Sequence, residues 1–331
     1  MNVDFALRMG NKAVEPIEIT AITPLSGIGG IRYGLHLAAI PVIWSSESNP
    51  HARIVQTVNF PREIPFTHPV QPIPTSVLAA NRPSIASLTL TPAHFRANNP
   101  KVDGGRHVDW LDWLKILDSV FPHAVLIDFP APRAADLYDT ALTDLVDRGY
   151  NLVWRNYNTA LVAPQRRDRM YVVGIHNRLT GGIRSSYRFP EIIDERWTLA
   201  DILEPDSAVE PSYTLSNRAW EGILRRAREN TMVGWGYELI DPNGTASTLN
   251  PSYFESRHEI LIPQRDKNPR ILTPIEARRL MGFPDYFEMP IPNTYVYRLL
   301  AQSSTPTIIR QIAYALKKSL LALLVGREVR S

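Results

Sequence analysis

The chain contains no cysteine, and this absence removes several kinds of chemistry at once. Without thiols it has no disulfides, no thiolate zinc site and no cysteine nucleophile. The eight histidines include none in an HExxH or similarly spaced metal pair. We therefore expect His94, His107 and His123 to be surface or packing residues rather than metal ligands.

Long hydrophobic runs are also missing. Charged, polar or proline residues interrupt every apolar run before it reaches the roughly 18 residues of a membrane span. The stretch from Met1 to Gly10 carries Asp4 and Arg8 and lacks the apolar centre of a signal peptide. These features predict a cytoplasmic protein without membrane contact.

Charge and length set only broad limits. A formal net charge of +3 and a sequence pI of about 9.1 are compatible with a polyanionic partner, although such a balance is more often only solvated surface. With 331 residues, 44% of them hydrophobic, the chain is long enough for one large domain and a smaller one.

A strand, a glycine turn and a helix follow one another near the N-terminus. Residues 17–23 are apolar and β-branched, 26–30 (SGIGG) form the turn, and 31–39 have helical spacing. A second strand, 41–45, leads to Glu47. This order is typical of a nucleotide-type cofactor site, where glycines let the backbone approach a ligand and the acid binds a ribose. Tight strand–helix turns also need glycine for packing, so the turn alone leaves both interpretations open.

The rest of the chain contains regular and irregular regions. Further strands are predicted at 85–91, 124–128, 152–157 and 169–175, and helices at 108–120 and 134–148. This alternation predicts an α/β domain. From about Asn177 to Asn268 turn residues multiply, which indicates a separate small domain or an irregular insertion. Thr273, Pro274 and Glu276 then form a capped helix start, and a last helix is expected at about 307–324.

Five segments resemble, in order, the motifs of the cytosine-C5 DNA methyltransferases. They are the glycine turn with Arg32, Gly34 and Leu35 after it, the second-strand region 42–60, PQRRDR at 164–169, NPRILTPIEARRLMGFPDYF at 268–287, and the closing stretch 297–313. The resemblance covers nearly the whole chain, and on it the chain is identified as a member of that family.

The resemblance implies a Rossmann-type S-adenosylmethionine-dependent methyltransferase fold with a smaller irregular target-recognition domain. It implies a methyltransferase domain at 1–176, a target-recognition domain at 177–268 and a return to the first domain at 269–331. Double-stranded DNA would lie in the cleft between them, with the target cytosine swung out of the stack. The residues that match the cofactor motifs are Leu25, Ser26, Gly27, Gly29, Gly30, Glu47, Gln302 and Ser303.

The catalytic motifs depart from the family. The family's chemistry attacks cytosine C6 with the cysteine of a Pro-Cys pair, but the matching segment 91–95 has Ala93 at the nucleophile position. We do not expect the adjacent His94 to replace it. The family's catalytic glutamate corresponds to Asp128, which is one methylene shorter. An acid that merely ends a strand fits that position equally well.

Arginines occur at positions that match the family's pocket and on one predicted surface helix. Arg167 and Arg169 match the pocket arginines of the family, the second of which reaches the cytosine O2. The alternative, which we favour, is that they are scaffold residues paired with acids such as Asp128. On a predicted helix at 218–230, Arg225, Arg226 and Arg228 are candidates for phosphate contacts, and a merely solvated helix face is an equal alternative.

The cofactor motifs have changed as well. Thr23-Pro24-Leu25 replaces Asp-Leu-Phe, Ala301-Gln302 replaces Gly-Asn, and the aspartate expected at about 69–74 is absent. Each missing hydrogen bond or aromatic interaction costs about 0.5–1.5 kcal/mol. Several such changes lower affinity by roughly two or more orders of magnitude, so we expect S-adenosylmethionine to bind weakly at most.

These patterns predict a DNA-binding homologue without catalysis. It would serve as a non-catalytic or regulatory subunit beside an active methyltransferase or a defence or modification system, although no motif identifies that partner. One alternative is an enzyme that modifies a flipped-out pyrimidine without cysteine, using Asp128 and Arg169. Another is an active-site variant of a true cytosine-C5 methyltransferase. Changes at several separate segments favour natural divergence over a single engineered change.

Overall fold

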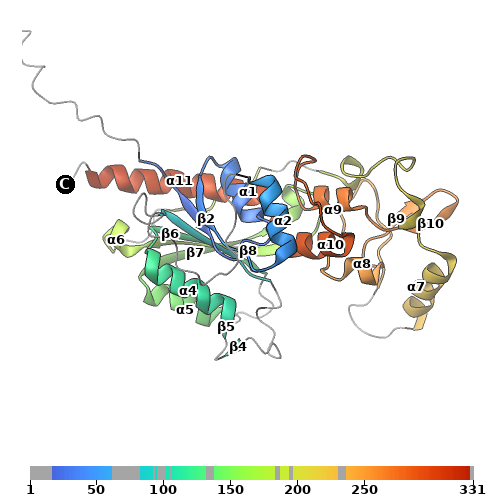
Figure 1. The fold of residues 1–331 in the computed structure, drawn as a ribbon, viewed down its shortest axis with the longest axis horizontal. Coiled ribbons are helices and arrows are strands. Elements are labelled where there is room, and N and C mark those ends of the chain that lie inside the picture. The colour runs from blue at the N-terminus through green and yellow to red at the C-terminus, as the bar shows by residue number, and fades with distance from the viewer. Residues whose placement is uncertain are drawn as a thin grey trace, which may run out of the picture.

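The computed structural model describes residues 17–61, 83–91, 94, 102–103, 106–131, 138–182, 187–193, 197–229 and 236–328. Its larger part is built on a six-stranded sheet with the order β2-β1-β3-β6-β8-β7 (Figure 1). The strands are β1 (Ala21–Thr23), β2 (Val42–Ser45), β3 (Ile85–Thr89), β6 (Ala124–Pro130), β7 (Tyr150–Asn158) and β8 (Asp168–His176).

One strand of this sheet, β8, runs against the other five. Strands β2, β1, β3 and β6 run parallel, whereas β8 is antiparallel to both β6 and β7. Strand β6 (AVLIDFP) is buried along its whole length, as expected for the centre of a sheet that is covered on both faces. A 3₁₀ turn, η2 (Thr159–Leu161), begins the connection from β7 to β8. The carboxyl ends of the parallel strands therefore meet at one edge.

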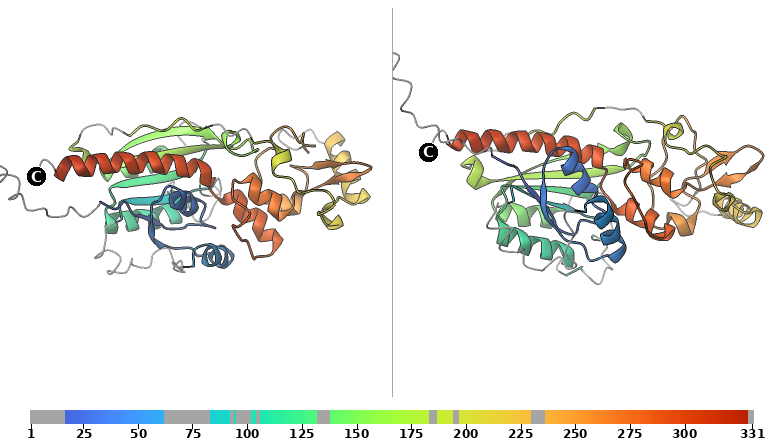
Figure 2. Two further views of the ribbon diagram at one scale, coloured as in Figure 1. Left: turned by 90° about the horizontal axis from the view of Figure 1, so that it is seen from above. Right: turned by 45° about the horizontal axis from the view of Figure 1, so that its top comes forward.

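Helices cover both faces of the sheet. Figures 1 and 2 show α1 and α11 on one face and α4 and α5 on the other. Their bounds are α1 (Gly30–Leu37), α11 (Pro306–Glu328), α4 (Val108–Val120) and α5 (Asp139–Asp147). Each pair closes its own hydrophobic core: α11 contributes Ile308, Ile312 and Leu316 on one side, and α4 contributes Trp110 and Trp113 on the other. This doubly wound α/β arrangement is the predicted fold class.

Shorter elements complete the described chain. Around the sheet lie α2 (Pro50–Asn59), the two-residue strands β4 (Val102–Asp103) and β5 (Arg106–His107), and α6 (Asn177–Thr180). Beyond it lie η3 (Leu199–Asp201), η4 (Pro211–Tyr213), α7 (Asn217–Glu229), α8 (Tyr253–Ser256), β9 (Ile262–Gln264), β10 (Lys267–Arg270), α9 (Pro274–Leu280) and α10 (Asn293–Gln302). No helix within the described ranges has the length and apolar character that a membrane span requires.

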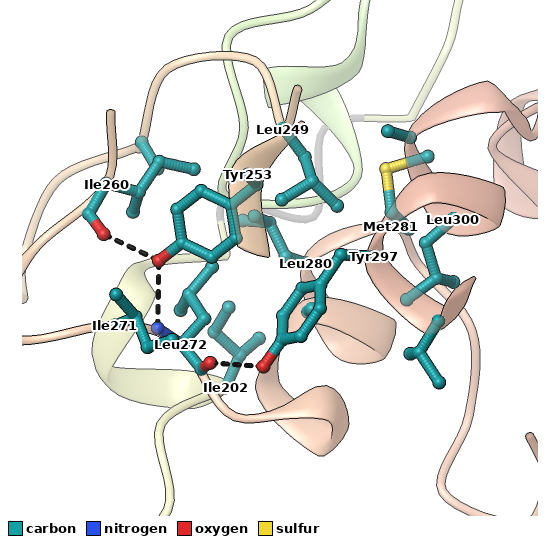
Figure 3. Close-up of a cluster of buried hydrophobic side chains, with 14 of the residues drawn as sticks. Ile202, Leu249, Tyr253, Ile260, Ile271, Leu272, Leu280, Met281, Tyr297 and Leu300 are labelled. Carbon is teal, nitrogen blue, oxygen red and sulfur yellow. Dashed lines mark hydrogen bonds between the residues drawn. The ribbon is translucent and has the colours of Figure 1, made fainter. Parts of the chain in front are cut away.

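A third core holds these later elements together. Tyr253 and Tyr297 are fully buried in it, and their hydroxyls are satisfied by backbone groups (Figure 3). The Tyr253 hydroxyl donates to Ile260 O at 2.6 Å and accepts from Leu272 N at 2.9 Å, and Tyr297 donates to Leu272 O at 2.6 Å. Buried tyrosines are tolerated because each polar end has a partner.

Most predicted elements are present, although some have other bounds and several short elements were not predicted. The first strand covers only 21–23, because 17–20 have no strand pairing. The helix expected at 134–148 is α5, and 132–137 lie outside the described residues. Helix α2 was not predicted, although Asn49 caps its start by accepting from His51 N and Ala52 N. The capping box at Thr273 is confirmed: its backbone N donates to Glu276 at 2.8 Å, and its hydroxyl accepts from Glu276 N at 3.2 Å.

Candidate functional site

A cavity of about 180 Å³ lies at the carboxyl edge of the parallel strands. Most of the residues assigned to cofactor binding line it, namely Leu25, Ser26, Gly27, Glu47, Gln302 and Ser303. Its other lining residues are Ser48, Asn49, Ala52, Thr89, Thr91, His94, Asp109 and Leu299. Segments from both ends of the chain thus meet at one site, as the closing motif predicts. Clefts for drug-sized ligands usually measure about 300–1,000 Å³, so this one is small.

The glycines of the turn serve different purposes. Gly27 adopts a φ of +56°, and open space surrounds the position that a Cβ would occupy. Gly29, with a φ of +93°, has the ring of Phe60 2.8 Å from its Cβ position. At Gly30 a Cβ would overlap Ser303 Oγ and would lie 2.5 Å from Ser304 O. Only the first of these glycines faces ligand space; the other two are required by packing.

The carboxylate of Glu47 accepts hydrogen bonds from two nearby backbone amides. One carboxylate oxygen accepts from Gly27 N at 2.6 Å and the other from Asn49 N at 2.7 Å. Burial raises the pKa of Glu47, while these two backbone amides act in the opposite direction. The carboxylate therefore ties the glycine turn to the start of α2.

Gln56, on α2, also binds the glycine turn, and it was not among the residues predicted from the sequence. Its amide nitrogen donates to Ser26 Oγ at 2.7 Å and to Gly27 O at 2.6 Å, and its oxygen accepts from Arg32 at 3.0 Å. The guanidinium of Arg32 also lies over the ring of Phe60, 4.3 Å from its centroid. These polar groups of the turn are satisfied within the protein itself.

Asp128 lies within β6, two residues before its end, and is fully buried with a hydrogen bond to each carboxylate oxygen. Arg169 Nε donates to Oδ1 at 2.6 Å, and Ser304 Oγ donates to Oδ2 at 2.5 Å. Arg169 also donates to Leu90 O at 2.7 Å, and Thr89 Oγ1 lies 2.8 Å from Ser304 Oγ. This network joins β3, β6, β8 and the start of α11, and Ser304 was not among the predicted site residues.

Arg167 is also buried, but it binds backbone rather than a carboxylate. Its guanidinium donates to Ser303 O at 2.8 Å and to Ala301 O at 3.1 Å. Burial, reinforced by the charge of Arg169, lowers the pKa of Arg167 to about 10. Arg167 thereby holds the junction of α10 and α11 against β8.

The nucleophile position, Ala93, lies outside the described residues. The neighbouring His94 is described and lies against the first turn of α4. Its Nε2 is 3.1 Å from Asp109 Oδ2, and His107 Nδ1 is 3.5 Å from the same oxygen. His123 lies elsewhere, just before β6. Two of the three histidines singled out from the sequence are thus brought together with a carboxylate.

The arginines of α7 are exposed, as the predicted surface helix requires. Ile223 is the buried residue of this helix, and Trp220 stacks edge-on against Tyr237. At 100° per residue, Arg225 and Arg228 point away from Ile223, whereas Arg226 lies on the flank. The same outer face also carries Arg218, Glu221 and Glu229.

Curated relatives of this chain are bacterial methyltransferases. It is 28% identical to the type II methyltransferase M.DsaV of Dactylococcopsis salina over 91% of this chain and 86% of that one. It is 29% identical to M.SsoII of Shigella sonnei over 87% of this chain and 77% of that one. A shorter match, 39% identical, covers 48% of this chain and 50% of M.NlaX of Neisseria lactamica, so the chain spans half the length of that relative.

Solved structures and a family description also match this chain to methyltransferases. The methyltransferase EhMeth of Entamoeba histolytica superposes with a TM-score of 0.69 at 16% identity, covering 93% of this chain and 99% of that one. Dnmt2 of S. pombe superposes with a TM-score of 0.66 at 18% identity, covering 92% of this chain and 99% of that one. These similarities show the Rossmann-type methyltransferase fold. Residues 110–318 match the family described as C-5 cytosine-specific DNA methylase. The chain therefore belongs to the C-5 cytosine-specific DNA methylase family.

Proposed function

We propose that this family member binds DNA without transferring methyl groups and acts beside an active methyltransferase. The observation that carries the proposal is the burial and hydrogen bonding of the Asp128 carboxylate, in a chain that has no cysteine. Its carboxylate is fully buried, with one oxygen bonded to Arg169 and the other to Ser304. A carboxylate held in this way is part of the scaffold and is not presented to a base.

The missing thiolate removes the covalent step that the family's reaction needs. Attack on cytosine C6 makes C5 nucleophilic, and alanine has no lone pair for that attack. A cysteine-independent route through Asp128 and Arg169 would first have to break their mutual hydrogen bond of 2.6 Å. Breaking a buried ion pair costs several kcal/mol, which supports a structural role for both residues.

The cofactor cavity supports weak binding of S-adenosylmethionine at most. Glu47, the residue matched to ribose binding, already accepts from Gly27 N and Asn49 N. The cavity volume of about 180 Å³ lies below the range of about 300–1,000 Å³ that is usual for ligands of that size. The small cavity and the altered motifs together support weak binding, so we assign no chemical step to the cofactor.

Double-stranded DNA is the proposed partner because the chain matches the C-5 cytosine-specific DNA methylase family and because the outer face of α7 carries Arg225 and Arg228. We further propose that 177–268 forms the recognition domain and that 1–176 with 269–331 forms the methyltransferase-type domain. An active methyltransferase as a second partner follows from the loss of chemistry: a DNA-binding homologue that cannot methylate would contribute recognition to one that can.

Fluorescence anisotropy with unmethylated duplex DNA tests the binding part of the proposal. We expect binding that weakens as salt rises and that does not depend on S-adenosylmethionine. The same preparation, mixed with DNA and labelled S-adenosylmethionine, should transfer no methyl groups. Failure to bind DNA at low salt would contradict the DNA-binding role, and methyl transfer would contradict the non-catalytic role.

A further inference from the structure

We propose that His94, His107 and Asp109 form a binding site for one divalent transition-metal ion. The three residues each offer a ligand atom, and these atoms all lie within 4.8 Å of one another. Two imidazoles and a carboxylate are a donor set that suits zinc, iron, cobalt or nickel better than magnesium or calcium. This inference does not depend on the proposed function, because it rests on the donor set and the distances between its ligand atoms and on no step of the family's reaction, although His94 is the neighbour of Ala93.

The distances between ligand atoms fit a single small ion. Bonds of about 2.1 Å to a tetrahedral metal place neighbouring ligand atoms roughly 3.4 Å apart. Here Asp109 Oδ2 lies 3.1 Å from His94 Nε2 and 3.5 Å from His107 Nδ1. The centroids of the two imidazole rings are 4.5 Å apart. Small side-chain movements would bring all three ligands onto one ion.

Hydrogen bonding around His94 fixes the orientation of its ring. Nδ1 accepts from Thr91 N at 2.9 Å, and it also lies 2.9 Å from Thr91 Oγ1 and 3.2 Å from Thr91 O. With Nδ1 as the acceptor, the ring proton lies on Nε2 and is donated to Asp109 Oδ2 at 3.1 Å. An ion that binds Nε2 would shift this proton to Nδ1, where Thr91 O or Thr91 Oγ1 can accept it. Metal-binding histidines typically donate their other N–H to a carbonyl or hydroxyl group in this manner.

The other two ligands are held by the start of α4. His107 is the N-cap of this helix, and its Nδ1 accepts from Asp109 N at 3.1 Å. An ion bound to this nitrogen would replace the hydrogen bond from Asp109 N. Because His94 comes from the segment after β3, the ion would link that segment to α4.

Local charge also favours a cation. Glu47 and Asp109 line the same cavity, so two carboxylates lie at this edge. His94 and Asp109 both line the cavity described above. A fourth coordination position on that side would be open to water or to an oxygen of a small anion.

Titration of the untagged, EDTA-treated chain with Zn²⁺ in a calorimeter tests the site. We expect one ion per chain with a Kd below about 1 µM. His94→Ala should weaken binding by roughly 100-fold, since it removes a direct ligand. His36→Ala is the matched control, because His36 is exposed on α1 and should leave the affinity unchanged.

Co²⁺ provides a second measurement that a nonspecific surface ion would not reproduce. Four-coordinate Co²⁺ has an intense visible absorption, which we expect for the native chain and for His36→Ala but not for His94→Ala or Asp109→Asn. Circular dichroism of each variant establishes that it is folded. Absence of a saturable one-to-one site would overturn the proposal, as would equal Zn²⁺ affinity in the native chain and folded His94→Ala.

Discussion

Arg169 donates from Nε to Oδ1 of Asp128 at 2.6 Å, between side chains that are only 4% and 0% exposed. The two residues lie on the neighbouring antiparallel strands β8 and β6. Removing one partner of such a pair leaves an uncompensated buried charge, which typically costs about 3–5 kcal/mol. We therefore propose that the pair is a structural element, at positions that the resemblance assigns to catalytic groups.

Arg169→Leu should lower the free energy of unfolding by about 3–5 kcal/mol, measured by urea denaturation. Arg155→Leu is the matched control, because Arg155 lies on the same hairpin and pairs at 2.8 Å with the exposed Glu191, its own side chain being 39% exposed. That variant should change stability little, since exposed pairs contribute little. Equal stability of the two variants would contradict a scaffold role for Arg169.

Gly30 should tolerate no side chain. Its Cβ position lies 2.5 Å from Ser304 O, so Gly30→Ala should destabilise the fold by about 1–3 kcal/mol through overpacking. Gly222→Ala provides the comparison, because nothing lies within 4 Å of its Cβ position within α7. Helix propensity should make that variant about 0.5–1 kcal/mol more stable. A change of the free energy of unfolding in the same direction for both variants would contradict the packing role of Gly30.

Arg225→Ala and Arg228→Ala should weaken DNA binding regardless of DNA sequence. An arginine that neutralises one phosphate should, when replaced, reduce the slope of log affinity against log salt by about one. Lys115→Ala is the control, because Lys115 is exposed on α4, far from α7 (Figure 1). Anisotropy titrations at several salt concentrations measure both quantities. An unchanged salt slope in the arginine variants would remove α7 from the DNA-binding surface.

Asp285 gives a prediction about pH. Its hydrogen bonds with Arg279, and next with Arg278, lower its pKa from 3.8 to about 2. Because the folded-state pKa lies below the ordinary value, the stabilisation is present above about pH 4 and is lost as pH falls toward 2. The carboxylate is 60% exposed, so the effect should be below about 1 kcal/mol.

Asp285→Asn should therefore lose less stability than the native chain on acidification. Unfolding free energies of both proteins, measured across this pH range, give the difference directly. Equal losses in the two proteins would show that the pairing with Arg278 and Arg279 contributes nothing.

The sequence predicted those elements whose signals are local. Helix α4 lies at 108–120 as predicted, because its apolar side chains recur at helical spacing. The start of α9 was found from Thr273, Pro274 and Glu276 alone. Helix α2 was missed even though Asn49 and Pro50 are good start signals, because its apolar residues are few and give a weak pattern.

The partners of the site residues could not be predicted, because they are distant in sequence. Ser304 and Asp128 are separated by 176 positions, and nothing near either residue indicates the other. The same holds for Gln56, which reaches Ser26 across 30 positions. His94 and Asp109 were separated by a segment without a recognised motif. Motif matching located the cavity, but only the fold shows how its groups are already bonded.

The most direct test of the account is a methyl-transfer assay on Ala93→Cys and the native chain together. Both would be incubated with labelled S-adenosylmethionine and unmethylated DNA of mixed sequence, beside an active cytosine-C5 methyltransferase as positive control. We expect no transfer by either chain, because restoring the thiol changes neither the buried Asp128–Arg169 pair nor the bonds of Glu47. Transfer by Ala93→Cys would mean that one residue alone silences the enzyme, and transfer by the native chain would mean that it is an enzyme; either result would contradict the account.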